Sequence, residues 1–277
     1  MRLGGPIFGT WESPEQWAAL VHGHGYSTAR CPLDETANEA TIASFVRAAA
    51  AADIVFAEVG AWSNPLSTDP AVAGAAIALC QRRLALADAI GAKCCVNIAG
   101  SRGDQWDGPH PDNLTADTFA LVVDTVRTII DAVQPGRTYY TLEPMPWAYP
   151  DSVDSYLDLI KAIDRPAFAV HLDPVNMISN PRLFYHNGEL LRDCVARLGP
   201  YIKACHAKDI ALSGKLTVHL SEMRPGTGSL DFATYLRELS TLDPDIPLLL
   251  EHLPGQEEYI DGARYVRAVA QQIGVAL

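Results

Sequence analysis

The segment Thr141-Leu142-Glu143-Pro144 decides the fold, because a short apolar, β-prone run ends there on a carboxylate. Three further segments repeat the pattern: His171-Leu172-Asp173-Pro174, Lys203-Ala204-Cys205-His206 and Leu248-Leu249-Leu250-Glu251. A buried strand has no reason to end on an acidic or imidazole side chain unless something at its end requires one. The four polar residues follow one another at intervals of 30, 33 and 45 residues, and the first two intervals match one strand plus one helix.

Strand-like runs alternate with helix-like runs along the whole chain. Eight strands are predicted over residues 3–8, 26–31, 54–59, 93–98, 139–142, 167–172, 201–205 and 247–250. Strict alternation predicts a parallel sheet with helical crossovers. The chain has 277 residues, and a (β/α)8 TIM barrel typically takes about 250. We therefore expect residues 1–277 to form a single barrel domain. The rival, an open doubly wound sheet, is disfavoured because no GxGxxG motif follows the first strand.

In a barrel, the carboxyl ends of the strands form the active face. Glu143, Asp173, His206 and Glu251 are therefore expected to meet at this face. Three long connections, over residues 60–70, 99–113 and 210–228, are expected to form its walls, because short connections are the default in such folds.

Composition limits the partners of the protein. The formal net charge is −12, from 21 Lys and Arg against 33 Asp and Glu, so we expect no nucleic acid partner. No apolar run is long enough to span a bilayer, and the N-terminus has no apolar region typical of a signal peptide. Six scattered cysteines without a CxxC motif are typical of reduced thiols. We expect a cytoplasmic protein without membrane contact, and the sequence leaves a homo-oligomer open.

Three carboxylates and one imidazole at the same barrel mouth predict a metal centre. Without a cation, the carboxylates would repel one another and their pKa values would rise. Oxygen-rich sites with one nitrogen ligand suit Mn²⁺, Mg²⁺ or Co²⁺ better than a structural Zn²⁺. We expect one divalent ion, with Mn²⁺ favoured and Co²⁺, Mg²⁺ or Zn²⁺ as alternatives. The competing interpretation is four separate capping or ion-pairing residues.

Several motifs together carry a family resemblance: Leu142-Glu143-Pro144, His171-Leu172-Asp173, Cys205-His206-Ala207-Lys208-Asp209, Pro225-Gly226-Thr227-Gly228 with Asp231-Phe232, and Leu250-Glu251. On these, the chain resembles the xylose isomerase-like superfamily, a (β/α)8 group with ketose 3-epimerases, inosose dehydratases and AP endonucleases of the same fold. The resemblance implies that Glu143, Asp173, His206 and Glu251 bind one divalent metal. It also implies that Glu143 and Glu251 are catalytic and move protons.

Two departures from the family pattern narrow the activity. Ketose 3-epimerases and AP endonucleases usually have a His three residues after the Asp, where this chain has Asn176. The endonucleases need extra His ligands on strands three and four, but the chain reads Glu58-Val59-Gly60 and Asn97-Ile98-Ala99 there. A trinuclear site and a phosphodiesterase activity are therefore disfavoured.

The residues predicted to bind substrate are His171, Asn176, Lys208, Arg224, Trp62 and Trp106. Each has a structural alternative: a buried core histidine, a surface ion pair, an exposed loop arginine, or tryptophans that pack the barrel rim. His252 is predicted to pack in the core, because it follows Glu251 and so points to the other side of the strand. The Gly226-Thr227-Gly228 segment is predicted to be a turn rather than a phosphate-binding loop.

The sequence predicts a metal-dependent sugar isomerase or epimerase. Such an enzyme moves a proton next to a carbonyl through an enediolate, on a small-molecule sugar or sugar-derived substrate. Two alternatives stay open. One is a dehydratase or lyase on a keto-sugar, keto-inositol or 3-keto-glycoside, and the other is a barrel that binds a sugar or a partner without catalysis.

Overall fold

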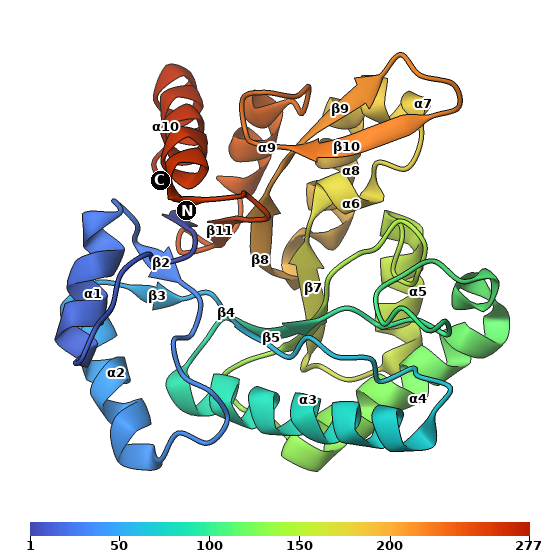
Figure 1. Cartoon of the computed structure of the whole chain (residues 1–277), viewed down its shortest axis with the longest axis horizontal. Coiled ribbons are helices and arrows are strands. Elements are labelled where there is room, and N and C mark those ends of the chain that lie inside the picture. The colour runs from blue at the N-terminus through green and yellow to red at the C-terminus, as the bar shows by residue number, and fades with distance from the viewer.

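The computed structural model describes residues 1–277 and shows a closed parallel barrel (Figure 1). The strand order in the sheet is β3-β2-β1-β11-β8-β7-β6-β5-β4, and all neighbouring pairs are parallel. The strands are β1 (Arg2–Gly4), β2 (Thr28–Ala29), β3 (Val55–Phe56), β4 (Glu58–Gly60), β5 (Cys94–Asn97), β6 (Tyr140–Leu142), β7 (Phe168–Leu172), β8 (Ile202–Ala207) and β11 (Pro247–Leu250). These bounds confirm the predicted TIM barrel fold.

The barrel closes through a single interrupted strand. β3 and β4 stand at the two ends of the strand order, yet only Ala57 separates them in sequence. The Ala57 N–H donates to the carbonyl of Ala29 at 2.9 Å, and its carbonyl accepts from the Cys94 N–H at 3.3 Å. Ala57 therefore connects the two edges of the sheet. Because β3 and β4 form one interrupted strand, the nine strands of the sheet correspond to eight strands of a barrel.

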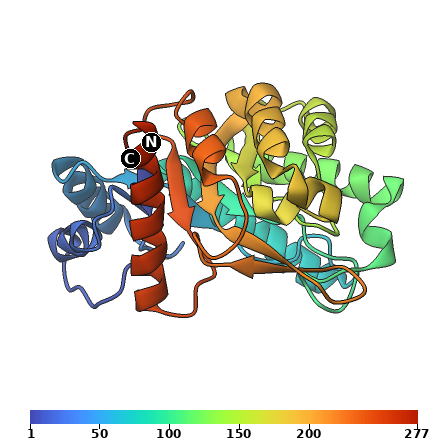
Figure 2. The ribbon, with the colours of Figure 1, turned by 90° about the horizontal axis from the view of Figure 1, so that it is seen from above.

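Helices surround the barrel as the alternation predicts (Figures 1 and 2). The main helices are α1 (Pro14–Gly23), α2 (Glu39–Ala51), α3 (Pro70–Ile90), α4 (Ala116–Val133), α5 (Val153–Ile163), α8 (Asn187–Leu198), α9 (Phe232–Leu239) and α10 (Gln256–Ile273). Polar side chains begin several of them, for example Ser13 for α1 and Asn38 for α2, because each accepts a bond from an otherwise unpaired N–H group. No helix is long and apolar enough to cross a membrane.

The structure adds elements where the sequence predicted only connections. After β8, residues 210–228 are not simply a long loop: the antiparallel strands β9 (Asp209–Ser213) and β10 (His219–Met223) form a hairpin that projects from the barrel (Figures 1 and 2). Two short helices, α6 (Pro174–Met177) and α7 (Pro181–Tyr185), follow β7. At four and five residues, both helices are too short to show an apolar period in the sequence that would predict them.

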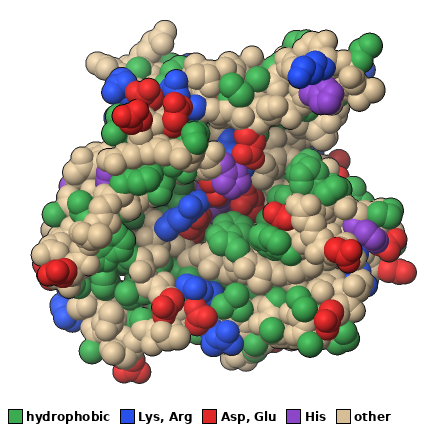
Figure 3. Space-filling model, viewed as in Figure 1, with side chains coloured by type: hydrophobic (Ala, Val, Ile, Leu, Met, Phe, Trp, Pro, Cys, Tyr) green, Lys and Arg blue, Asp and Glu red, His purple; other side chains and the backbone are tan.

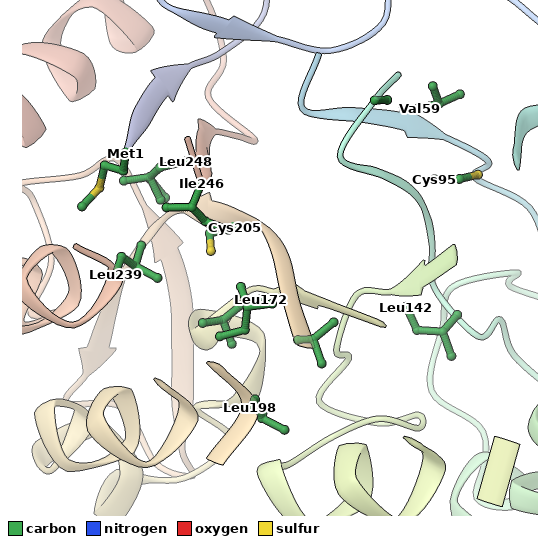
Figure 4. Close-up of a cluster of buried hydrophobic side chains, with 14 of the residues drawn as sticks. Met1, Val59, Cys95, Leu142, Leu172, Leu198, Cys205, Leu239, Ile246 and Leu248 are labelled. Atoms are coloured by element: carbon green, nitrogen blue, oxygen red, sulfur yellow. The ribbon is translucent and has the colours of Figure 1, made fainter. Parts of the chain in front are cut away.

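Apolar side chains form one large layer between the strands and the helices. Figure 4 shows Leu172, Cys205 and Leu248 from three neighbouring strands in this layer, with Leu198 and Leu239 from α8 and α9. A second, small apolar cluster consists of Cys94, Val96 and Ala204, which alternate with Cys95 and Cys205 of the outer layer and therefore face the barrel interior. Since successive side chains of a strand point to opposite sides, the outward position of Leu172 places His171 and Asp173 in the interior.

Close contact between strands requires a glycine in β1. A Cβ atom on Gly4 would lie 2.7 Å from Leu249 Cδ2 and even nearer to the carbonyl oxygen of Thr28. Gly4→Ala is therefore expected to lower the free energy of unfolding by about 1–3 kcal/mol, because overpacking forces the neighbouring strands apart.

The matched control is Gly74→Ala in the exposed middle of α3, where a Cβ meets nothing within 4 Å. This change is expected to raise the free energy of unfolding by about 0.5–1 kcal/mol through helix propensity. Urea unfolding of both variants measures the difference. Equal effects of the two substitutions would contradict the close packing at β1.

Candidate metal centre

Glu143, Asp173, His206 and Glu251 come together at the carboxyl ends of β6, β7, β8 and β11. One ligand atom from each lies within 4.8 Å of the others, and all four side chains are buried. Nδ1 of His206 lies 2.8 Å from Glu251 Oε2, 3.2 Å from Glu143 Oε1 and 3.6 Å from Asp173 Oδ2. The four residues that end apolar runs in the sequence are thus one cluster in space.

Two buried tyrosines of the outer helices hold the backbone beneath this cluster. The Tyr156 hydroxyl on α5 contacts the carbonyls of Leu142 at 2.7 Å and His171 at 2.9 Å. The Tyr235 hydroxyl on α9 donates to the carbonyl of His206 at 3.0 Å. These bonds fix the strand ends from outside the barrel, so the positions of the ligands depend on the helical layer as well as on the sheet.

The donor atoms fit a divalent ion. Asp173 is also a helix cap, since its Oδ1 accepts from the N–H groups of Val175 and Asn176 at the start of α6. Its second oxygen, Oδ2, and Glu251 Oε2 are buried, and their neighbours are ion-pair partners, Lys208 Nζ at 2.6 Å and His206 Nδ1 at 2.8 Å. Three buried carboxylates around one imidazole nitrogen are costly without further positive charge, and a divalent ion would supply it. Glu143, Asp173, His206 and Glu251 are accordingly the residues that would hold the ion.

Positive groups also lie against the carboxylates. Lys208 is buried, with its Nζ 2.6 Å from Asp173 Oδ2, 3.4 Å from Glu251 Oε2 and 3.1 Å from Glu222 Oε1 on β10. Burial alone would lower the pKa of Lys208, but Asp173 and the other carboxylates raise it well above its usual value. Lys208 therefore stays charged and contributes to the balance of charge in the cluster.

The two glutamates of the cluster differ in their electrostatic surroundings. Burial raises the pKa of Glu143, and the neighbouring Glu251 adds to this, although His206 opposes it. For Glu251, burial alone would raise the pKa, but His206, Lys208 and Arg30 lower it below its usual range. Unequal environments around paired carboxylates are typical of sites that separate acid and base roles.

A cavity of about 300 Å³ opens above the cluster, and of the four candidate ligands only Glu143 and Glu251 reach its wall. The lining residues are Arg30, Trp62, Ile98, Trp106, Asp107, Glu143, Met145, Asn176, Glu251 and His252. Trp62 and Trp106 contribute large apolar surfaces, whereas the remaining wall is mostly polar or charged. Figure 3 shows this combination in the hollowed centre of the face, where acidic, basic and histidine side chains lie beside hydrophobic ones.

The other residues predicted to bind substrate lie in different places. Asn176 lines the cavity and donates from Nδ2 to Glu143 Oε1 at 3.1 Å. Lys208 lines a neighbouring cavity of about 400 Å³, and Arg224 lines the same cavity with its Nε 2.6 Å from Glu258 Oε2. His171 does not reach either cavity, because it is fully buried below the cluster with its Nε2 2.7 Å from Glu58 Oε2.

The prediction for His252 was wrong. Its side chain is 57% exposed and lies at the mouth of the cavity, 3.0 Å from Glu222 Oε2. The reason is its left-handed backbone, with φ at 55°, which ends the alternation of the strand.

The turn at residues 225–228 has a structural role. The buried carboxylate of Asp209 accepts from the N–H groups of Gly226, Gly228 and Leu230 at 2.8 to 3.0 Å. These N–H groups are therefore already satisfied within the protein.

Sequence reasoning missed Arg30 and Glu58. Arg30 bridges two carboxylates, with Nε 2.8 Å from Glu58 Oε1 and Nη2 2.9 Å from Glu251 Oε1. A signal for Glu58 was present, since a carboxylate interrupts the apolar run Val55-Phe56-Ala57-Glu58-Val59. Its partners lie on other strands, so their identity was not available from the local sequence.

Comparison with known proteins identifies the family. A sequence model described as xylose isomerase-like TIM barrel matches residues 18–269. The chain belongs to this family. Comparison with functionally curated proteins found no match.

Solved structures show the same fold at low sequence identity. A xylose isomerase-like TIM barrel protein from Mycobacterium smegmatis in complex with magnesium is 18% identical, with a TM-score of 0.66 over 95% of this chain and 90% of that one. D-psicose 3-epimerase with D-tagatose from Clostridium cellulolyticum H10 is 14% identical, with a TM-score of 0.70 over the full length of both chains. A probable 3-DHS dehydratase from Bacillus anthracis is 16% identical, with a TM-score of 0.68 over 94% of each chain.

Binding of a divalent ion to this cluster is expected to stabilise the folded protein. At a free ion concentration about 100-fold above Kd, the free energy of unfolding should rise by about 2.7 kcal/mol. Thermal unfolding with Mn²⁺, Co²⁺ or Mg²⁺, before and after addition of EDTA, measures this effect. His206→Ala should abolish the stabilisation, whereas Asp124→Asn on the exposed face of α4 should retain it. If the ion stabilised both variants equally, it would have to bind at another site.

Proposed function

We propose that this protein is a divalent-metal-dependent isomerase or epimerase of a sugar or sugar-derived carbonyl compound. It would act by proton transfer next to the carbonyl through an enediolate. The observation that carries the proposal is the division within the ligand cluster: Glu143 and Glu251 line the cavity, while Asp173 and His206 are fully buried beneath it. Two carboxylates thus have access to a bound molecule, and the other two ligands do not.

The chain's own residues account for the proton transfers. A substrate in the cavity would contact Glu143 and Glu251, and one of them would accept the proton from the carbon next to the carbonyl. The same carboxylate or the other would return the proton, to the same carbon in an epimerase or to the neighbouring carbon in an isomerase. Bound divalent metal, for which Mn²⁺ is the first candidate, would polarise the carbonyl and stabilise the enediolate.

The cavity wall supports a polyhydroxy substrate. Trp62 and Trp106 offer faces on which the apolar side of a sugar can stack. Asn176, Asp107 and His252 offer donors and acceptors for hydroxyl groups. Asn176 stands where ketose 3-epimerases usually have a histidine, so its amide can bind a hydroxyl but cannot serve as a base.

A dehydratase or lyase is the second candidate, because it uses the same enediolate and differs in losing a group from the adjacent carbon. The similarity in fold to the probable 3-DHS dehydratase from Bacillus anthracis favours including it. A screen of ketoses, keto-inositols and 3-keto-glycosides in D₂O separates the candidates. Deuterium in an isomeric product supports the isomerase or epimerase, and loss of water from the substrate supports the lyase.

Glu251→Gln is expected to separate metal binding from proton transfer. The amide keeps the shape and one oxygen donor but cannot accept a proton. Loss of a positioned base typically costs about 10²–10⁴-fold, so exchange of the substrate α-proton with D₂O should fall by at least 10²-fold while much of the metal is retained. Proton exchange followed by NMR and metal content measured on the same sample test this.

His206→Ala is the comparison variant for this experiment, because it should lose the metal first and regain part of its activity in excess Mn²⁺. If metal-loaded Glu251→Gln exchanges the α-proton at the wild-type rate, Glu251 is not a base. The mechanism would then rest on Glu143 or Lys208. Absence of exchange with every substrate in metal-loaded wild type would instead favour the non-catalytic binding barrel.

A further inference from the structure

A fourth carboxylate, Glu58, lies in the barrel interior beneath the ligand cluster. It belongs to β4 and its side chain is fully buried. Its Oε2 lies 2.7 Å from Nε2 of His171 and 3.7 Å from Nε2 of His206, and the two imidazole rings pack edge to face with centroids 4.2 Å apart. Its other oxygen, Oε1, accepts from Arg30 Nε at 2.8 Å. One carboxylate therefore faces three positively charged or proton-donating groups.

The two nitrogens of His206 have different surroundings. Nδ1 faces the three carboxylates of the metal centre, with Glu251 Oε2 nearest at 2.8 Å. Nε2 is buried without a hydrogen bond, and the acceptor that faces it is Glu58. An imidazole that gives Nδ1 to a metal must carry its proton on Nε2, and a carboxylate behind such a proton fixes the tautomer and the orientation of the ring.

Arg30 extends the same arrangement to Glu251. Its Nε binds Glu58 and its Nη2 binds Glu251 Oε1, so the planar guanidinium spans both carboxylates. With Oε1 of Glu251 occupied, its Oε2 is left directed at His206 Nδ1. Arg30 therefore determines which oxygen of Glu251 faces the metal centre.

Positive and proton-donating groups surround Glu58. Arg30 Nε lies 2.8 Å from its Oε1, and His171 Nε2 lies 2.7 Å from its Oε2. A charged carboxylate is a stronger acceptor than a protonated one and donates to nothing. Glu58 thus binds Arg30 and His171 at hydrogen-bond distance, and it is the carboxylate that faces His206 Nε2, at 3.7 Å.

We propose that Glu58 is a positioning residue that orients His206 directly and Glu251 through Arg30, and so sets the metal affinity of the site. The proposal rests on the metal centre assumed in the proposed function, but not on which reaction follows. Neither Glu58 nor His171 reaches the cavity, so their contribution is to the ligands and not to the substrate.

The test measures Mn²⁺ affinity by calorimetry in the full-length protein. Glu58→Gln is expected to weaken Mn²⁺ binding by about 10–100-fold, which is typical for loss of a carboxylate behind a metal-bound histidine. Glu58→Asp keeps the charge but is one methylene shorter, so it should also lose affinity by about 10-fold. If Glu58 acted only through its negative charge, Glu58→Asp would instead keep the wild-type affinity for Mn²⁺.

Asp124→Asn is the matched control, since it removes one negative charge from the exposed face of α4 and Asp124 is not among the ligands or the cavity wall. Its Mn²⁺ affinity should stay within about threefold of wild type. The visible spectrum of the Co²⁺-loaded protein gives a second readout, because it depends on ligand orientation. The spectrum should change in both Glu58 variants and not in Asp124→Asn. A role in stability alone would lower the melting temperature and leave affinity and spectrum unchanged.

Arg30→Lys keeps the proposal testable if the Glu58 variants do not fold. Lysine retains the charge but cannot span Glu58 and Glu251 with a planar fork, so Mn²⁺ affinity should fall and the Co²⁺ spectrum should change. Wild-type affinity and spectrum in every folded variant among Glu58→Gln, Glu58→Asp and Arg30→Lys would overturn the proposal. Because these readouts need no substrate, weakened metal binding supports it even if no sugar reaction is found.

Discussion

Repulsion between buried carboxylates is the constraint on which this structure depends. Glu58, Glu143, Asp173 and Glu251 all lie in the barrel interior or at its mouth, where water is scarce. The protein offsets their charge with Arg30 and Lys208, and with His206, whose pKa is raised well above its usual value by Glu251 and Glu143 against the effect of burial. The balance is incomplete, because four buried carboxylates face only Arg30, Lys208 and His206 in this part of the barrel, with His171 beside Glu58.

The sequence predicted the barrel and the four clustered residues because both depend on local patterns. Each strand end combines an apolar run with one polar residue, and parallel strands bring their carboxyl ends to the same face. Arg30 and Glu58 were missed because their role depends on ion pairs among Arg30, Glu58 and Glu251, which are far apart in sequence. His252 was misplaced because a single residue with positive φ ended the alternation on which the prediction relied.

The reaction is harder to predict from the sequence than the fold is, and the reason is physical. An isomerase, an epimerase and a dehydratase that act through an enediolate would all need a polarised carbonyl and a carboxylate base, and would differ in where a few groups on the substrate lie. Those differences reside in the cavity wall, which here includes Trp62, Trp106 and Asn176 from three separate connections. Solved structures of 14–18% identity establish the fold of the barrel, but they do not establish what this wall binds.

The position of β11 between β1 and β8 has a consequence for biosynthesis. This strand closes the barrel by pairing with residues near the other end of the chain, as in Leu3 with Leu248, and the residue that follows it is Glu251. A nascent chain still lacking residues 247–251 has neither a closed sheet nor the complete set of candidate ligands. Tight binding of an ion would then require that synthesis has reached the end of this strand. Chains that end before it would not bind the metal tightly, whereas chains with the complete barrel would.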